Sequence, residues 1–245
     1  MIEFLAQEKK SSGLFKKMTT EKPYKCEYCG ASFTREKTLA VHMCEKKRRR
    51  LQKNEKRVQT GYYAFTRFYK LSAGTKTEKT YEDFCASPYY NAFVKFGSFV
   101  NNVRPLYPEK YIDYVVTSRV KLDHWCRDAL YEKYATELVL KESMETAIER
   151  SIQTVMDWSA EAEAPWNDYF RYASLSRVTR DIKDGKVSPW LVLNCPSGKE
   201  MLSKFTDEQL EIVYTVIEPK HWALRFKRVP ADVEVVKEVA KESNL

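Results

Sequence analysis

The sequence is poor in glycine and histidine, with seven glycines and three histidines in 245 residues. Neither a G-x-G-x-x-G pattern nor a Walker A loop occurs, so a nucleotide-binding α/β fold is disfavoured. With three histidines, no Ser/His/Asp or Cys/His catalytic grouping can be assembled. We therefore predict that the chain is not an enzyme and name no catalytic residue.

Long apolar runs are also missing. No uninterrupted stretch of about 18 apolar residues occurs, so we expect no membrane-spanning segment and no membrane partner. The opening MIEFLAQEKK lacks the apolar centre of a signal peptide. Six cysteines without such a signal favour reduced thiols, and we expect a cytoplasmic protein.

The most informative stretch has the spacing C-x2-C-x3-F-x5-L-x2-H, formed by Cys26, Cys29, Phe33, Leu39 and His42. A two-residue gap lets both thiolates of a tight turn face one tetrahedral Zn²⁺. Twelve further residues suffice to close a hairpin and begin a helix that carries the histidine. The Phe and Leu supply the small apolar core of so short a unit. The pattern predicts a zinc site.

The fourth zinc ligand is less evident from the spacing. Cys44 is the nearest donor, but residues i and i+2 of an α-helix point to nearly opposite sides. A Cys26/Cys29/His42/Cys44 site therefore requires the helix to unwind or tighten after His42. The alternative is a distant fourth ligand, for which the candidates are Cys85, Cys126 and Cys195.

Residues 21–48, including the lead-in EKPYKC, resemble the two-Cys, two-His zinc finger. The resemblance implies a ββα fold whose helix starts near Glu36. It also places four residues where the family contacts DNA bases, with an arginine suited to guanine and a lysine suited to phosphate: Arg35, Lys37, Thr38 and Val41. The sequence departs from the family after His42, where residues 46–48 are Lys-Lys-Arg instead of the second histidine region.

Positive charge is concentrated directly after this motif. The formal net charge is +8, and residues 46–57 hold eight basic side chains against one Glu, whereas residues 58–245 hold 26 basic and 27 acidic side chains. A basic block beside a finger is typical of an arm that binds phosphates and releases counterions. We predict nucleic-acid contacts, with DNA favoured over RNA, from Lys46, Lys47, Arg48, Arg49, Arg50, Lys53, Lys56 and Arg57.

The segment YYAFTRFYKL, beginning at Tyr62, combines aromatic and basic residues. Such a segment could stack single-stranded bases, but aromatic residues at this density more often form a core or an interface, and we favour the core interpretation. We assign residues 58–80 to a linker with this aromatic segment.

Helical periodicity dominates the rest of the chain. We expect a break near Ser143 in the long pattern of residues 123–164, one helix over 166–184, and an extended or turn-like piece over 187–199. A capping box at Thr206 predicts a helix to Glu218, and Pro219 and Pro230 precede two last helices. The predicted fold is mainly α, with a small ββα zinc finger and basic extension followed by a larger, mostly helical domain. Its parts are a tail (1–20), the finger with its basic arm (21–57), the linker (58–80) and the helical domain (81–245).

The Tyr-, Trp- and Lys/Glu-rich helical part is similar to uncharacterised proteins of contractile-tailed bacteriophages. This resemblance implies a phage accessory factor in transcription, replication or recombination, acting in the host cytoplasm. We predict a zinc-finger protein that binds nucleic acid largely through phosphates, with a protein partner or self-association through the helical domain. The alternatives are an assembly protein that uses the zinc knob for protein contacts, and a metal-dependent nuclease around Asp207, Glu218 and Lys220.

Overall fold

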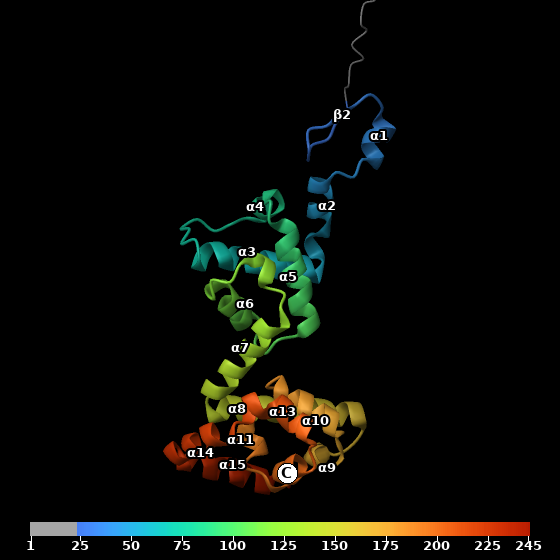
Figure 1. The fold of residues 1–245 in the computed structure, drawn as a ribbon. Coiled ribbons are helices and arrows are strands. Elements are labelled where there is room, and N and C mark those ends of the chain that lie inside the picture. The colour runs from blue at the N-terminus through green and yellow to red at the C-terminus, as the bar shows by residue number, and fades with distance from the viewer. Residues whose placement is uncertain (1–23) are drawn as a thin grey trace, which may run out of the picture. The chain divides into compact units, whose positions relative to one another are not determined.

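The computed structural model describes residues 24–245 and divides the chain into two compact units. We call the described part of the first, residues 24–53, the metal unit, and residues 54–245 the helical unit. The predicted tail and the first residues of the finger lead-in lie outside the described residues. Within residues 24–245, Figure 1 shows mostly helices, and the strands form one short pair, which confirms the predicted mainly α fold with a small N-terminal sheet.

The metal unit is a short hairpin followed by two short helices. Strand β1 (Tyr24–Lys25) pairs antiparallel with β2 (Ser32–Phe33), and α1 (Glu36–Val41) begins at the residue that the finger resemblance implies. After an extended stretch come α2 (Glu45–Leu51) and the 3-10 turn η1 (Gln52–Asn54). Among residues 24–53, Cys26 is the one buried residue, so this unit has almost no hydrophobic core.

The first half of the helical unit surrounds an aromatic core. Its elements are α3 (Lys56–Leu71), α4 (Tyr81–Ala86), α5 (Tyr90–Val103), α6 (Pro108–Thr117), η2 (Leu122–His124) and α7 (Asp128–Lys141). Phe65, Phe93 and Trp125 are buried in this core. The ring centroids of Phe65 and Phe93 are 5.4 Å apart, and those of Phe93 and Trp125 are 5.7 Å apart. Burial of large aromatic rings contributes strongly to stability, so this core holds the helices together.

The structure corrects the predicted linker over residues 58–80. Its first part lies in α3, whose residues Val58, Ala64 and Phe65 are buried in the aromatic core. The helix has a buried stripe on one side, and only the segment from Ser72 to Thr80 connects helices. The aromatic residues of YYAFTRFYKL therefore pack mainly into the interior, as the favoured core interpretation has it. Apolar and polar residues alternate imperfectly in that segment, so its helical periodicity was not recognised from the sequence.

The second half of the helical unit has a separate hydrophobic core around Trp190 and Trp222. Helix α7 contributes to both cores, through Tyr131 to the first and Val139 to the second. The remaining elements are α8 (Met144–Ala162), η3 (Trp166–Asp168), α9 (Tyr169–Tyr172), α10 (Leu175–Lys183), α11 (Pro189–Val192), α12 (Pro196–Ser203), α13 (Asp207–Ile217), α14 (Pro219–Arg228) and α15 (Pro230–Glu242).

Capping residues decided most of these helix boundaries. The break near Ser143 is confirmed, because its hydroxyl accepts the N–H of Thr146 and begins α8. The capping box at Thr206 is confirmed as the start of α13. Two expectations were wrong. Residues 166–184 form three short helical pieces, and 187–199 contain two helical pieces, each begun by a cap followed by proline.

Helices α3 and α5 approach each other closely where two glycines face across the contact. A Cβ atom added to Gly97 would lie 2.1 Å from the carbonyl oxygen of Arg57 and 2.7 Å from the nitrogen of Gly61. Backbone atoms cannot move aside as a flexible side chain can. The contact between these helices therefore requires glycine at residue 97.

We predict that Gly97→Ala destabilises the helical unit by about 1–3 kcal/mol or more, because overpacking against backbone forces the helices apart. Chemical denaturation followed by tryptophan fluorescence measures this. The control is Asn102→Ala on the exposed side of α5, which should change the free energy of unfolding by less than about 0.5 kcal/mol. Equal stability of the two variants would show that α3 and α5 do not make this contact.

Candidate metal centre

Three sulfurs and one imidazole converge in the metal unit. The ligand atoms of Cys26, Cys29, His42 and Cys44 all lie within 4.8 Å of one another. The Cys26 and Cys44 sulfurs are 4.0 Å apart, and the Cys29 sulfur is 3.3 Å from His42 Nε2. Tetrahedral Zn²⁺, with Zn–S of about 2.3 Å and Zn–N of about 2.0–2.1 Å, requires edges of about 3.8 Å and 3.5 Å. These four residues could therefore hold a metal ion.

The hairpin turn positions the first two sulfurs. The Cys26 N–H donates to the Ala31 carbonyl at 2.8 Å, and the Gly30 N–H donates to the Cys26 carbonyl at 2.8 Å. Gly30 has a φ of +75°, which glycine adopts without steric cost. The turn thus folds back on itself and directs both thiols of the C-x2-C pair to the same side.

Helix α1 brings His42 to these sulfurs. The helix ends at Val41, and the imidazole lies against the Phe33 ring with centroids 4.7 Å apart. Leu39 on the same helix is half-buried, and with Phe33 it supplies the small apolar core that the spacing predicted. Strand β2 and helix α1 therefore hold the histidine through one aromatic contact rather than through a large core.

The extended backbone after α1 allows Cys44 to join the cluster. His42 has φ −68° and ψ 117°, and Cys44 has φ −76° and ψ 161°. In extended chain, residues i and i+2 point to the same side, so His42 and Cys44 face one centre although one residue separates them. This is the unwinding that a Cys44 ligand requires. Of the distant alternatives, Cys85 and Cys195 are buried in the cores of the helical unit.

Backbone hydrogen bonds and neighbouring thiols set the electrostatics of the sulfurs. The N–H of Cys29 is the main group that lowers the pKa of Cys26, and burial opposes it. The N–H of Ala31 lowers the pKa of Cys29, but burial and the adjacent Cys26 and Cys44 thiols outweigh it and raise that pKa overall. Three thiols so close to one another repel as thiolates, and a bound cation would neutralise them.

Cys44 also begins the next helix. Its sulfur accepts the Lys47 N–H at 3.4 Å as the cap of α2, and the Lys47 ammonium donates to the His42 carbonyl at 3.4 Å. The Arg50 guanidinium lies 5.2 Å from the centroid of the Tyr28 ring in the hairpin, within the range of a cation–π interaction. The cluster and the first part of the basic block therefore form one small structure. The sequence did not reveal α2 as a separate helix.

The predicted nucleic-acid residues fall in three places. Arg35, Lys37, Thr38 and Val41 are exposed on and just before α1, a helix of six residues and about 9 Å. In α2 and η1, Lys46, Arg48, Arg50 and Lys53 are exposed, while Lys47 and Arg49 are half-buried, the latter paired with Glu45. Lys56 and Arg57 belong to the helical unit, where Arg57 pairs with Glu55 at 2.8 Å.

The residues of the nuclease alternative are not brought together. Asp207 is the first residue of α13, and Glu218 follows its last residue. Eleven residues of α-helix separate them by about 16 Å, too far for one metal ion. Within residues 24–245, the cysteine and histidine cluster is the one group of three or more His, Cys, Asp or Glu donors close enough for a shared ion.

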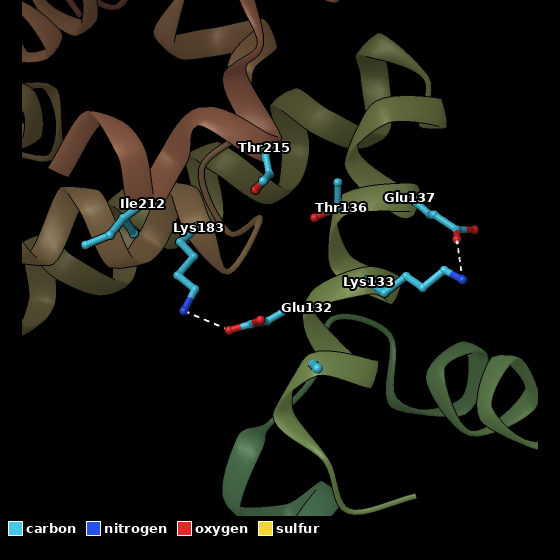
Figure 2. Close-up of a pocket in the computed structure, with 8 residues that line it drawn as sticks. Glu132, Lys133, Thr136, Glu137, Lys183, Ile212 and Thr215 are labelled. Atoms are coloured by element: carbon cyan, nitrogen blue, oxygen red, sulfur yellow. Dashed lines mark ion pairs between the residues drawn. The ribbon is translucent and has the colours of Figure 1, made fainter. Parts of the chain in front are cut away.

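A pocket of about 500 Å³ lies between α7 on one side and α10 and α13 on the other. Figure 2 shows the Lys183–Glu132 ion pair spanning it, with the nitrogen and oxygen 2.9 Å apart, while Lys133 and Glu137 interact at 4.0 Å on the outer face of α7. Its lining contains no Cys, His or Ser: Ala129, Glu132, Lys133, Thr136, Glu137, Lys183, Ile212 and Thr215. Its two lysines and two glutamates form ion pairs with one another.

We predict that Cys44→Ser weakens zinc binding at least about tenfold, the loss typical of disturbing even an outer-shell partner. The measurement is zinc content and affinity of the full chain after chelator competition. Cys26→Ser should behave in the same way, and Cys126→Ser, in a half-buried position of the helical unit, is the control. Normal zinc affinity in Cys44→Ser together with loss in Cys126→Ser would assign the fourth ligand to the distant cysteine.

We also predict that a chelator unfolds the metal unit and leaves the helical unit folded. Burial of one residue cannot order residues 24–53, whereas metal binding in such small units contributes about 10–16 kcal/mol. Amide hydrogen exchange of the full chain should lose protection in residues 24–53 alone. Unchanged protection there would show that the unit folds without metal.

Comparison with known proteins gives no relative for this chain. No family model, no curated protein and no solved structure matches it significantly. The predicted similarity of the helical part to phage proteins therefore has no support from these comparisons. Among the helices of residues 24–245, none combines the length and the apolar character needed to cross a membrane.

Proposed function

We propose that this protein is a zinc-binding accessory factor that binds nucleic acid, mainly through phosphates, with the cationic helix α2. The observation that carries the proposal is the convergence of three sulfurs and one imidazole directly before a helix of basic residues. The metal holds the hairpin, α1 and the start of α2 together, and it has a structural role.

Zinc is the metal that suits this donor set best. Thiolate and imidazole ligands in a tetrahedral arrangement favour zinc over the hard cations Mg²⁺ and Ca²⁺, which prefer oxygen. Four protein ligands leave no open position for substrate, as in structural rather than catalytic zinc sites. A reducing cytoplasm suits three free thiols, and we place the protein there.

The proposed phosphate binding depends on the exposed cations of α2 and on the link between this helix and the metal cluster. Four cations of α2 and the adjoining turn η1 are exposed: Lys46, Arg48, Arg50 and Lys53. The acidic residue of α2 is Glu45, which pairs with Arg49. Because Cys44 both caps α2 and lies in the cluster, metal binding orders these cations before the ligand arrives. Preordering lowers the entropy cost of binding, and each phosphate contact releases counterions.

Base reading has less structural support than phosphate contact. The helix α1 has six residues, and the side chains suited to bases or phosphates are Arg35, just before it, and Lys37 on it. One finger reads about three base pairs, so we propose weak sequence preference and DNA as the favoured nucleic acid. A role in phage transcription, replication or recombination rests on the resemblance of the helical part alone.

A second candidate function is assembly through the metal unit. Val41, Met43 and Leu51 are large apolar residues that are 80%, 56% and 64% exposed. Apolar side chains at this exposure suit a protein contact. In this alternative the zinc knob docks a protein partner or a second copy, and the basic residues surround the contact.

We predict that DNA binding weakens steeply with salt, with a log–log slope near −0.9 for each phosphate contact. A Lys46→Glu, Arg48→Glu double variant should bind at least about tenfold more weakly and with a shallower slope. Fluorescence anisotropy with a labelled duplex at several NaCl concentrations measures both quantities. The matched control is Lys241→Glu, an exposed cation of α15.

The same titration separates the two candidate functions. Salt-independent affinity, or equal loss in the control and the double variant, would contradict the phosphate proposal. Assembly predicts instead that Met43→Ser shifts the molecular mass measured by light scattering or abolishes capture of a purified partner. DNA binding should survive that substitution.

A further inference from the structure

A second cationic feature lies in the helical unit, apart from the basic arm. Side chains at i, i+3, i+4 and i+7 of α14 form one stripe, His221, Leu224, Arg225 and Arg228, and face the C-terminal turn of α7 at Leu140 and Lys141. These six residues line a pocket of about 400 Å³, within the range of small-ligand sites. The lining has three permanent cations and a histidine, with no acidic residue.

This concentration of charge differs from the rest of the unit. Residues 58–245 are nearly balanced, with 26 basic and 27 acidic side chains. Of the pocket cations, Lys141 has a loose pair with Glu137 at 3.7 Å and is 76% exposed, and Arg228 is exposed. Both side chains can therefore reorient toward a ligand at small cost.

Arg225, one of the lining residues, is held in a fixed position. Its two terminal nitrogens donate to the carbonyl oxygens of Leu140 and Glu142 at the end of α7. Its guanidinium also lies 5.3 Å from the Trp190 ring centroid and 5.2 Å from that of Trp222. The carbonyls and the two rings orient the charge without neutralising it.

Arg225 also lacks the partner that similar arginines have. Among residues 24–245, five arginines are half-buried, and four of them, Arg49, Arg67, Arg150 and Arg177, form ion pairs with carboxylates. Arg225 forms none. The nearby Glu142 carboxylate is held by Arg150 and by the Ser188 hydroxyl at 2.7 Å and 3.0 Å. Burial lowers the pKa of Arg225, although the Glu142 and Asp232 carboxylates oppose this.

We propose that the pocket between the end of α7 and α14 binds a phosphate group, with Arg225 as the fixed cation and Lys141 and Arg228 closing on the anion. A half-buried cation without a carboxylate is stabilised by an anionic ligand, because charge-assisted hydrogen bonds to phosphate supply the ion pair that the site lacks. The phosphate belongs either to a small compound or to a nucleic-acid backbone. The site is independent of the metal centre.

Tryptophan fluorescence of the full chain reports on this pocket directly. All five tryptophans lie in the helical unit, and two of them contact Arg225. Sodium phosphate is titrated at constant ionic strength against sodium chloride. We expect a saturable fluorescence change with phosphate and none with chloride. Lys141→Glu, Arg228→Glu should weaken the phosphate affinity at least tenfold.

Lys227→Glu is the matched control, because Lys227 is an exposed cation of the same helix outside the pocket lining. It should change the affinity less than twofold, and thermal melts should show that all variants fold. No saturable phosphate response, or equal loss in the control and the pocket variant, overturns the proposal.

A 12-nucleotide single strand as competitor identifies the source of the phosphate. Displacement of phosphate by the strand assigns the site to a nucleic-acid backbone, and no displacement assigns it to a small phosphate compound. Either result supports a phosphate site once the saturable response is present. Phosphate binding that persists in Cys26→Ser would show that this site stands even if the metal unit binds no DNA.

Discussion

The metal unit depends on the convergence of four donor side chains around one point. Residues 24–53 bury one side chain, so hydrophobic burial cannot hold the hairpin and the two helices together. Three sulfurs and an imidazole within 4.8 Å of one another supply the missing cohesion once a cation neutralises them. The orientation of the basic helix α2 depends on that convergence, because Cys44 is both a donor and the cap of α2.

The metal unit differs from the two-Cys, two-His finger that it resembles in where its helix ends, because α1 stops at Val41. A longer helix would keep the chain helical through the second histidine position. Here the chain is extended between His42 and Cys44, and a new helix begins at the fourth donor. The cations of α2 therefore adjoin the donor cluster through Cys44, which is also the cap of that helix. In the helical unit the arrangement is different, because aromatic packing fixes Arg225 and its charge without metal.

Sequence reasoning succeeded where a residue acts through local chemistry. The Cys and His spacing, the caps at Ser143 and Thr206 and the helical character of the chain all depend on neighbours within a few residues. It failed where tertiary packing decides. Tyr62 to Tyr69 alternate poorly, although they lie in helix α3, which packs closely against α5. Residues 187–199 were predicted to be extended or turn-like, but Pro189 and Pro196 each follow a capping side chain and open a helix. The hydrogen bonds from Arg225 of α14 to the end of α7 link residues 83 and 85 positions apart, which no local pattern specifies.

X-ray absorption spectroscopy at the zinc edge, on the full chain purified with its metal, tests the central claim most directly. The account predicts one zinc per chain with three sulfur neighbours at about 2.3 Å and one nitrogen neighbour at about 2.0–2.1 Å. A first shell with two sulfurs, a shell of oxygen neighbours, or a chain that retains no zinc would contradict it.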